Sequence, residues 1–295
     1  MQIIKIKPQG FCKGVIKAIK KLNEALPNIK NNIYMSGGIV HNEHIINAYK
    51  DKGIIQINDF NEILNLLKEN DTFIITAHGL SNKKRKILED KNIHILDTTC
   101  DEVRKIQEII FEKEKENYEI IYYGSKKHPE CMAILEDHQN IHLIENINDI
   151  YAFNIKSNKI LFASQTTASY LDVKIIEDLL KKKYKNIIML SDICTATKQR
   201  QLALINKSKD CDLILIIGDK NSNNTSKLKE IASKNTKAIL IENIEEMKDI
   251  DFANINILGI TAGASTPNIL VTEIIKTIEN NNYISNIKND DYIKI

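Results

Sequence analysis

Residues 1–26 read MQIIKIKPQGFCKGVIKAIKKLNEAL. Residues 3–6 have the composition of a short β-strand, and a glycine-bounded loop at 10–14 follows with Cys12 at its middle. The apolar residues after this loop recur at the spacing of one helix face: Val15, Ile19, Leu22 and Leu26. A strand, a loop and a helix in this order form a βα unit. Such units build parallel sheets, whose ligands bind in the loops at the carboxyl ends of the strands.

The rest of the chain continues this alternation of strands and helices. Further strands are predicted at residues 33–35, 73–76, 93–96, 120–123, 160–163, 187–190, 213–217, 238–241 and 255–260. Two later helical segments have predicted apolar faces, at Leu171, Ile175 and Leu179 and at Leu270, Ile274 and Ile278. The sequence therefore predicts an α/β protein with mostly parallel sheets.

Three cysteines recur with this pattern. Cys12, Cys100 and Cys194 are 88 and 94 residues apart. Two polar loops follow each cysteine, and they contain His41 and His78, His128 and Thr166, and Ser222 and Ser265. Such a period suits a small α/β domain. We predict three similar small α/β domains, at residues 1–98, 99–192 and 193–281, with a tail at 282–295. They would pack around a pseudo-threefold centre where the three thiols meet.

Three converging thiols allow three interpretations. A [4Fe–4S] cluster held by three cysteines leaves one iron open, as a catalytic centre requires. A zinc ion with three cysteines and a water is the second interpretation. Three unrelated buried thiols are the third, because cysteine is among the most often buried residues. Cys131 and Cys211 fall outside the spacing, and we expect them to be packing residues.

The polar loops contain groups that bind anions. Free N–H groups at helix N-termini bind phosphate, although loop hydroxyls and amides also serve as helix caps. His41, His78 and His128 occupy equivalent loops and would add donors to one anion. Glu130, two residues after His128, is interpreted either as a proton donor, with the Thr166 hydroxyl as a relay, or as a carboxylate that stabilises a helix start.

The composition excludes several classes of protein. Hydrophobic residues make up 43% and charged residues 27% of the chain, which excludes a disordered or fibrous protein. A net charge of +2 gives no general attraction to nucleic acid. The longest uncharged stretch, 253–272, contains polar residues, Gly and Pro and predicts no membrane span. Five cysteines, an odd number, and no secretory signal predict a reducing compartment. We expect this compartment to be the cytoplasm of a bacterium, or an organelle stroma if an upstream targeting segment has been removed.

The motif residues resemble the 4-hydroxy-3-methylbut-2-enyl diphosphate reductase family, the last enzymes of the methylerythritol phosphate route to isoprenoids. The matching segments run in order along nearly the whole chain, at residues 10–15, 41–42, 77–79, 97–100, 128–130, 165–167, 193–194 with 200–201, 221–222 with 224, and 261–265. The resemblance implies three similar α/β domains around a [4Fe–4S] cluster. It implies Cys12, Cys100 and Cys194 as the iron ligands.

The resemblance also implies a reaction and the roles of the polar residues. The reaction is reductive dehydroxylation of the allylic alcohol diphosphate to isopentenyl and dimethylallyl diphosphates, with electrons from a ferredoxin or flavodoxin type donor. Glu130 would deliver protons, and Thr166 would contact the substrate hydroxyl. The implied diphosphate pocket contains His41, His78, His128, Ser222, Asn224 and Ser265.

Two positions depart from the family pattern. Asp101 stands where family members commonly have proline, and a carboxylate beside an anionic cluster is expected to lower its potential. Asn223 stands where many members have serine, and its amide can still donate to phosphate. Two rival functions use part of the same pattern. One is a hydro-lyase whose cluster acts only as a Lewis acid, and the other is an iron–sulfur sensor or carrier that needs no anion-binding loops.

Overall fold

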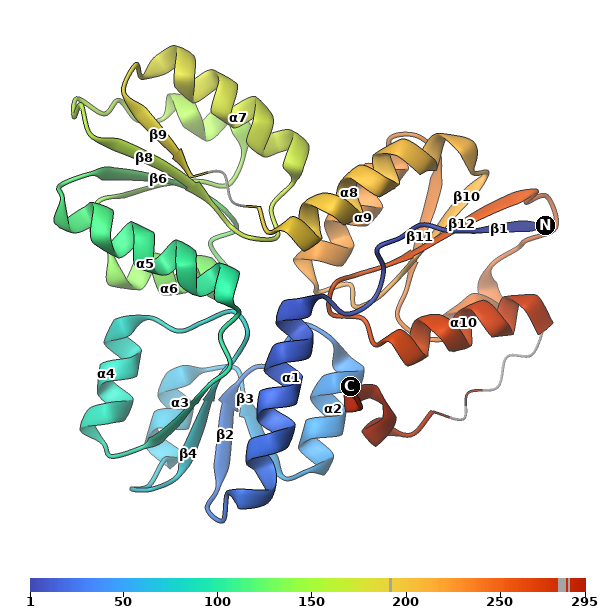
Figure 1. Ribbon diagram of the computed structural model, residues 1–295, viewed down its shortest axis with the longest axis horizontal. Coiled ribbons are helices and arrows are strands. Elements are labelled where there is room, and N and C mark those ends of the chain that lie inside the picture. The colour runs from blue at the N-terminus through green and yellow to red at the C-terminus, as the bar shows by residue number, and fades with distance from the viewer. Residues whose placement is uncertain (191–192, 281–284, 286) are drawn as a thin grey trace.

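The computed structural model describes residues 1–190, 193–280, 285 and 287–295. The chain forms three lobes around a common centre, each with a four-stranded parallel sheet (Figure 1). The predicted α/β class with parallel sheets is therefore confirmed. Helices pack on both faces of each sheet, because the strands are apolar on both sides and cannot be exposed to water.

The bounds of the elements are as follows. The strands are β1 (Gln2–Lys5), β2 (Ile33–Ser36), β3 (Ile54–Ile57), β4 (Thr72–Ile75), β5 (His94–Asp97), β6 (Glu119–Tyr123), β7 (Ile141–Ile144), β8 (Ile160–Ser164), β9 (Ile187–Leu190), β10 (Leu213–Ile217), β11 (Lys237–Ile241) and β12 (Ile257–Ala262). The α-helices are α1 (Lys13–Ala25), α2 (Glu43–Asp51), α3 (Phe60–Leu66), α4 (Asn82–Asp90), α5 (Asp101–Lys115), α6 (Pro129–Asp137), α7 (Tyr170–Lys183), α8 (Thr195–Lys207), α9 (Asn223–Ser233) and α10 (Asn268–Asn280).

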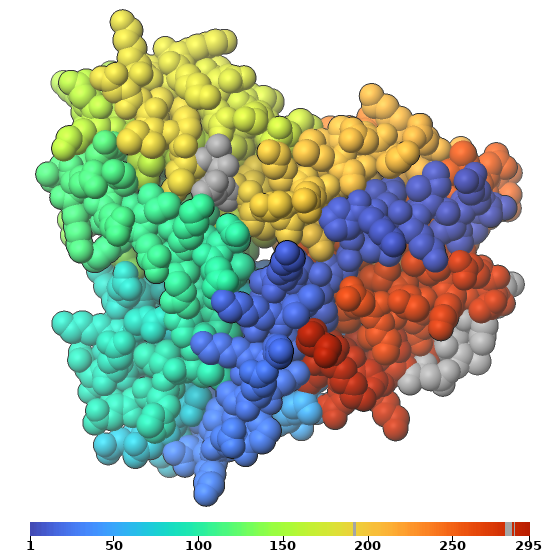
Figure 2. Space-filling model, viewed as in Figure 1, coloured from blue at the N-terminus to red at the C-terminus, as the bar shows by residue number. Residues whose placement is uncertain are grey.

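The three sheets have the same strand order. The first is β3-β2-β4-β5, the second is β7-β6-β8-β9, and the third, written in the same direction, is β11-β10-β12-β1. We call the lobes that contain these sheets the first, second and third units. The fourth strand of the third unit is thus the N-terminal strand β1, which pairs in parallel with β12 from Gln2 opposite Ile257 to Lys5 opposite Ile260. The N-terminal residues lie against the third unit in Figure 2.

The position of β1 corrects one predicted boundary. Residues 1–98 do not form one domain, because β1 completes the sheet of the third unit rather than that of the first. The spacing of motifs reveals that a strand exists but not which sheet it joins. The predicted boundaries at residues 192 and 281 fall outside the described residues.

Each fourth strand leads into a cysteine and then into a helix of the next unit. After β1 and Cys12, α1 packs its Val15 and Ile19 into the core of the first unit. After β5 and Cys100, α5 packs into the second unit, and after Cys194, α8 packs into the third. Each of the three cysteines therefore lies where the chain passes from one unit to the next.

The structure contains two strands that the sequence did not predict, β3 and β7. It also shows that the predicted apolar face of α7 is wrong, because Ile175 on that face is 46% exposed. The buried residues of this helix are Val173, Ile176, Glu177 and Leu180.

The predicted tail at 282–295 joins two units. Its 3-10 turn, Asn289–Ile293, places Tyr292 in the core of the third unit and Ile293 in the core of the first. Asn23 also donates a hydrogen bond from Nδ2 to the carbonyl of Ile293 (2.8 Å). Within the described residues, the helices are all too short or too polar to cross a membrane.

Candidate active site

One cavity collects the predicted site residues from all three units. It has a volume of about 90 Å³ and lies at the carboxyl ends of the strands. Its lining includes Cys12, His41, His78, Cys100, His128, Glu130, Thr166, Cys194, Ser222, Asn223, Asn224 and Ser265. Loops that are far apart in the sequence converge here because the three parallel sheets direct their carboxyl edges to the centre (Figure 1).

The three cysteines occupy equivalent positions in the structure. Each is the N-cap residue of a helix, and α1, α5 and α8 all begin near the centre and run outward (Figure 1). The three backbone N–H groups donate to equivalent carbonyls: Cys12 to Ala264 (3.0 Å), Cys100 to Ala77 (3.1 Å) and Cys194 to Thr166 (3.1 Å). The sulfurs therefore lie at the positive ends of three helix dipoles, which stabilise negative charge.

Gly14 shows how closely the sulfurs approach each other. A Cβ atom at this position would lie 2.6 Å from the Cys100 Sγ and 3.8 Å from the Cys12 Sγ. Two sulfurs from different units thus share the space that a side chain would fill. Burial, with smaller contributions from the neighbouring Cys12 and Cys194, raises the pKa of the Cys100 thiol to about 11. Three thiolates at this place need a cationic partner, and the donor set fits an iron–sulfur cluster or another thiophilic metal centre.

Hydrogen bonds hold the sulfur of Cys194 in place. The Thr197 N–H donates to the Cys194 Sγ (3.4 Å), and the Thr197 hydroxyl lies 3.0 Å from the same sulfur. The Val15 N–H donates to the Cys12 Sγ in the same way (3.4 Å). In contrast, Cys131 and Cys211 are buried in the cores of the second and third units, as predicted for packing residues. All five cysteines are free of disulfides.

The three predicted loop histidines form one cluster. The ring centroids of His41 and His78 are 4.3 Å apart, and that of His128 lies 5.3 Å from His41 and 5.2 Å from His78. Burial lowers the pKa of all three, that of His128 to about 3. The rings are therefore neutral at pH 7 until an anion stabilises their protonated forms.

The three histidines can hold either a metal ion or an anion, since one ring nitrogen from each histidine lies within 4.8 Å of the others. The tautomer of His128 favours the anion. Its Nδ1 accepts the N–H of Glu130 (3.2 Å), so its proton lies on Nε2 and that atom is a donor. The Nε2 of His41 is buried with no partner among the described residues, which leaves it for a ligand.

Loops of the third unit supply the other polar residues of the cavity. We call these residues, together with the three histidines, the polar wall: His41, His78, His128, Ser222, Asn224 and Ser265. Ser222 is the N-cap of α9, and Asn224 accepts the N–H of Ala264 (3.1 Å). The Ser265 hydroxyl donates to the carbonyl of His41 (2.9 Å), which joins the third unit to the first. The amide of Asn223, expected to remain a phosphate donor, donates to the carbonyl and hydroxyl of Thr167.

Glu130 is buried beside the thiols and accepts several hydrogen bonds. Thr166 donates to it twice, from the backbone N–H (2.8 Å) and from the hydroxyl (2.8 Å), and the buried Tyr122 hydroxyl donates at 3.4 Å. Burial nevertheless raises the pKa of Glu130 to about 7, against the opposing effect of the Thr166 bonds. A carboxyl group with such a pKa can hold and release a proton near neutral pH.

Sequence reasoning missed two residues at this site. Thr167, rather than Thr166, is the structural equivalent of His78 and Ser265, because it follows the carbonyl that binds the cysteine N–H. The buried Asp219 joins the loops that contain His41 and Ser222, since it accepts the N–H of Glu43 (3.0 Å) and of Asn221 (2.7 Å). The equivalent position of Thr167 and the bridging role of Asp219 both depend on hydrogen bonds between loops that are far apart in the sequence.

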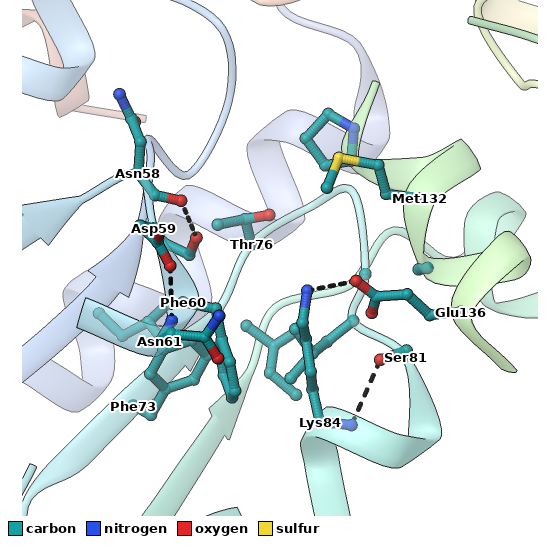
Figure 3. A pocket seen from close by; sticks show the side chains of 17 residues that line it. Asn58, Asp59, Phe60, Asn61, Phe73, Thr76, Ser81, Lys84, Met132 and Glu136 are labelled. Carbon is teal, nitrogen blue, oxygen red and sulfur yellow. Dashed lines mark hydrogen bonds and ion pairs between the residues drawn. The ribbon is translucent and has the colours of Figure 1, made fainter. Parts of the chain in front are cut away.

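A larger pocket, of about 720 Å³, lies between the first and second units (Figure 3). Its wall contains Phe60, Phe73 and Met132, together with an ion pair between Lys84 Nζ and Glu136 (2.6 Å). The described residues that line it include no cysteine or histidine. It therefore lacks the chemical groups that the smaller central cavity concentrates.

Three α/β units that bring thiols, imidazoles and a titratable carboxyl to one cavity have the arrangement of an enzyme active site. Comparison with known proteins gives the particular family. A family model described as LytB protein matches residues 3–279. The chain therefore belongs to the LytB protein family.

Similar proteins agree with this assignment. The chain is 39% identical over 289 residues to a protein of Bacillus pumilus and 37% identical over 286 residues to one of Halalkalibacterium halodurans. Both are named 4-hydroxy-3-methylbut-2-enyl diphosphate reductase, and each alignment covers 95% of this chain and 91% of the relative. These relatives are oxidoreductases.

Solved structures give the same result. The structure of the E-1-hydroxy-2-methyl-but-2-enyl-4-diphosphate reductase from Plasmodium falciparum has a TM-score of 0.89 and 33% identity, and the match covers 96% of this chain and 89% of that one. A structure titled (E)-4-hydroxy-3-methyl-but-2-enyl diphosphate reductase, the terminal enzyme of the non-mevalonate pathway, has a TM-score of 0.67 and 30% identity, with 95% and 99% covered.

Proposed function

We propose that this chain reduces 4-hydroxy-3-methylbut-2-enyl diphosphate to isopentenyl and dimethylallyl diphosphates. One substrate, two electrons and two protons give one product and one water. The proposal rests on one observation above all: the cavity that holds the three thiols also holds the three histidines and Glu130. The names of the relatives at 37% and 39% identity support the same reaction.

Cys12, Cys100 and Cys194 would hold a [4Fe–4S] cluster. The helix N-termini behind the sulfurs and the space left by Gly14 support this assignment. When bound, such a cluster supplies single electrons and an open iron that acts as a Lewis acid toward oxygen. Electrons would come from a ferredoxin or flavodoxin type donor.

The polar wall would bind the diphosphate. The Nε2–H of His128 donates to a phosphoryl oxygen, and His41 and His78 can add donors because a diphosphate raises their pKa. Ser222, Asn224 and Ser265 surround the same space. Binding at this wall fixes the substrate so that its hydroxyl end faces the thiols, which lowers the entropic part of the barrier.

Glu130 would deliver the proton that makes the hydroxyl a leaving group. When Glu130 is protonated, the direction of the 2.8 Å hydrogen bond between it and the Thr166 hydroxyl is reversed: the Thr166 oxygen accepts the Glu130 proton while the Thr166 hydroxyl proton passes to the substrate oxygen. Water then leaves as the carbon–oxygen bond breaks. The contact of Thr166 with the substrate hydroxyl also orients that group, so one residue both relays and positions.

Anaerobic reconstitution with iron and sulfide tests the proposal. We expect four iron atoms per chain, a paramagnetic signal after one-electron reduction, and formation of both products only when a reductant is present. Turnover of the alcohol diphosphate without reductant would instead indicate a hydro-lyase. A reconstituted cluster with no binding of substrate would indicate a sensor or carrier. Zinc in place of iron, with no turnover, would reject the cluster.

A further inference from the structure

The chain has three arginines, and Arg200 differs from the other two. Arg85 and Arg104 both pair with Asp97, and Arg104 is 40% exposed. Arg200 is only 3% exposed, and it forms no ion pair with a carboxylate of the described residues. A guanidinium group is always charged in proteins, and burial of an uncompensated charge is strongly unfavourable.

The hydrogen bonds of Arg200 place its charge between two of the cysteine loops. One terminal nitrogen donates to the carbonyl of Gly10 (2.6 Å), two residues before Cys12, and the other donates to that of Ala196 (2.9 Å), two residues after Cys194. Its Nε is buried and has no partner among the described residues. The side chain therefore spans the junction between the segments that bear Cys12 and Cys194.

The two loops that this charge contacts are the loops that bear Cys12 and Cys194. Burial lowers the pKa of Arg200, and negative charge on Cys12 and Cys194 opposes this effect. Carbonyl dipoles solvate a guanidinium group but do not neutralise it. Cys12 and Cys194 would supply the compensating negative charge as thiolates when they ligate the proposed cluster.

We propose that Arg200 is a positioning residue that balances the negative charge of the cysteine-ligated cluster and raises its reduction potential. This inference rests on the proposed three-cysteine [4Fe–4S] site. Reduction adds one negative charge to a centre that already carries three thiolates. A fixed buried cation stabilises the reduced form more than the oxidised form, and the potential of such clusters follows local charge and hydrogen bonding.

The experiment compares the midpoint potentials of four reconstituted proteins: wild type, Arg200→Gln, Arg200→Lys and Arg104→Gln. Potentials are measured anaerobically by redox titration followed by electron paramagnetic resonance, with iron and sulfide content measured beside them. Arg104→Gln is the matched control, because it removes an arginine one helical turn from Cys100 that is exposed and already paired with Asp97.

We expect Arg200→Gln to shift the potential to a more negative value, by several times the shift of Arg104→Gln, with Arg200→Lys closer to wild type. Equal potentials in wild type and Arg200→Gln would overturn the inference. If Arg200→Gln assembles no cluster, a wild-type potential in Arg200→Lys supports the role of charge, and loss of the cluster in both variants overturns it. Failure of the wild type itself to assemble a four-iron cluster rejects the proposed function.

Discussion

Glu130→Gln tests the chemistry of the site most directly. The change keeps the size of the side chain and one acceptor oxygen for the Thr166 N–H, while the Thr166 hydroxyl can turn to accept from the new amide. It removes the only proton that Glu130 can transfer. We therefore expect the variant to fold, to hold its cluster and to bind substrate, but to turn over slowly.

The magnitude follows from the role of the carboxyl group. General acid catalysis contributes about 10²–10⁴-fold, or about 3–5 kcal/mol of transition-state stabilisation, so kcat should fall by about that factor while KM changes little. The assay is steady-state reduction of the alcohol diphosphate with a chemical reductant, at equal iron content. The matched control is Glu177→Gln, because Glu177 is also a buried carboxyl on a helix of the second unit, at 2% exposed, and binds Lys174 (3.1 Å) away from the cavity.

The pH dependence of kcat is a second test of the role of Glu130. The carboxyl must be protonated to donate, and burial raises its pKa from 4.5 to about 7. The protonated fraction is therefore high below pH 7 and falls above it, so kcat of the wild type should decrease by about tenfold per pH unit in the alkaline limb. The limb should vanish in Glu130→Gln. A wild-type rate in this variant, or a limb that persists in it, would refute the assignment of Glu130 as the proton donor.

Three further predictions follow from the geometry. Gly14→Ala should fold but lose cluster iron, because its Cβ would lie 2.6 Å from the Cys100 Sγ, and iron analysis showing wild-type content would contradict this. Cys194→Ser should lose cluster absorbance and activity together; a full spectrum without activity would show that this sulfur is no ligand. Asp219→Asn should raise KM by about tenfold with a smaller effect on kcat, because it weakens a charge-assisted link between the loops that contain His41 and Ser222, where we propose that the diphosphate binds. Asp137→Asn, which cuts a similar link to the start of α4, should leave KM unchanged.

Local sequence patterns predicted most of the fold, and their failures have physical causes. The apolar, β-branched runs predicted ten strands, because a strand buried on both faces needs such residues along its whole length. The two strands that were missed, Ile54–Ile57 and Ile141–Ile144, are edge strands of four residues, and each contains a polar residue, Gln56 or His142. A strand with only one neighbour need not be apolar throughout, so its pattern is weak.

The face of α7 was wrong for a different reason. This helix has apolar residues on more than one side, and a spacing of four selects Leu171, Ile175 and Leu179 as readily as the buried set. The buried set includes Glu177, a charged residue that sequence reasoning would place outside, and whose side chain reaches Lys174. The direction of a helix face is decided by the sheet it packs on, which a single helix sequence does not contain.

The site was predictable to the extent that it repeats. Spacing grouped the three cysteines and the polar loops, and the structure places them around one cavity. Asp219 and Arg200 were not predictable in this way, because each occurs once and acts across a boundary between loops that are far apart in sequence. A long-range contact made by a single residue produces no repeated spacing in the sequence, so spacing does not predict it.

The repeated unit also explains how the cavity can align a substrate. In each unit, the N–H of a cysteine binds a carbonyl whose next residue is polar and lines the cavity: Ala77 precedes His78, Thr166 precedes Thr167, and Ala264 precedes Ser265. A cysteine and a polar residue of the cavity are thus tied to one short backbone segment three times. These hydrogen bonds hold the backbone of each cysteine against that of a polar cavity residue, so local contacts set the distance between the thiols and the polar residues. The proposed reduction would need this distance to be fixed, because the diphosphate and the hydroxyl of one substrate would have to reach the polar residues and the thiols at the same time.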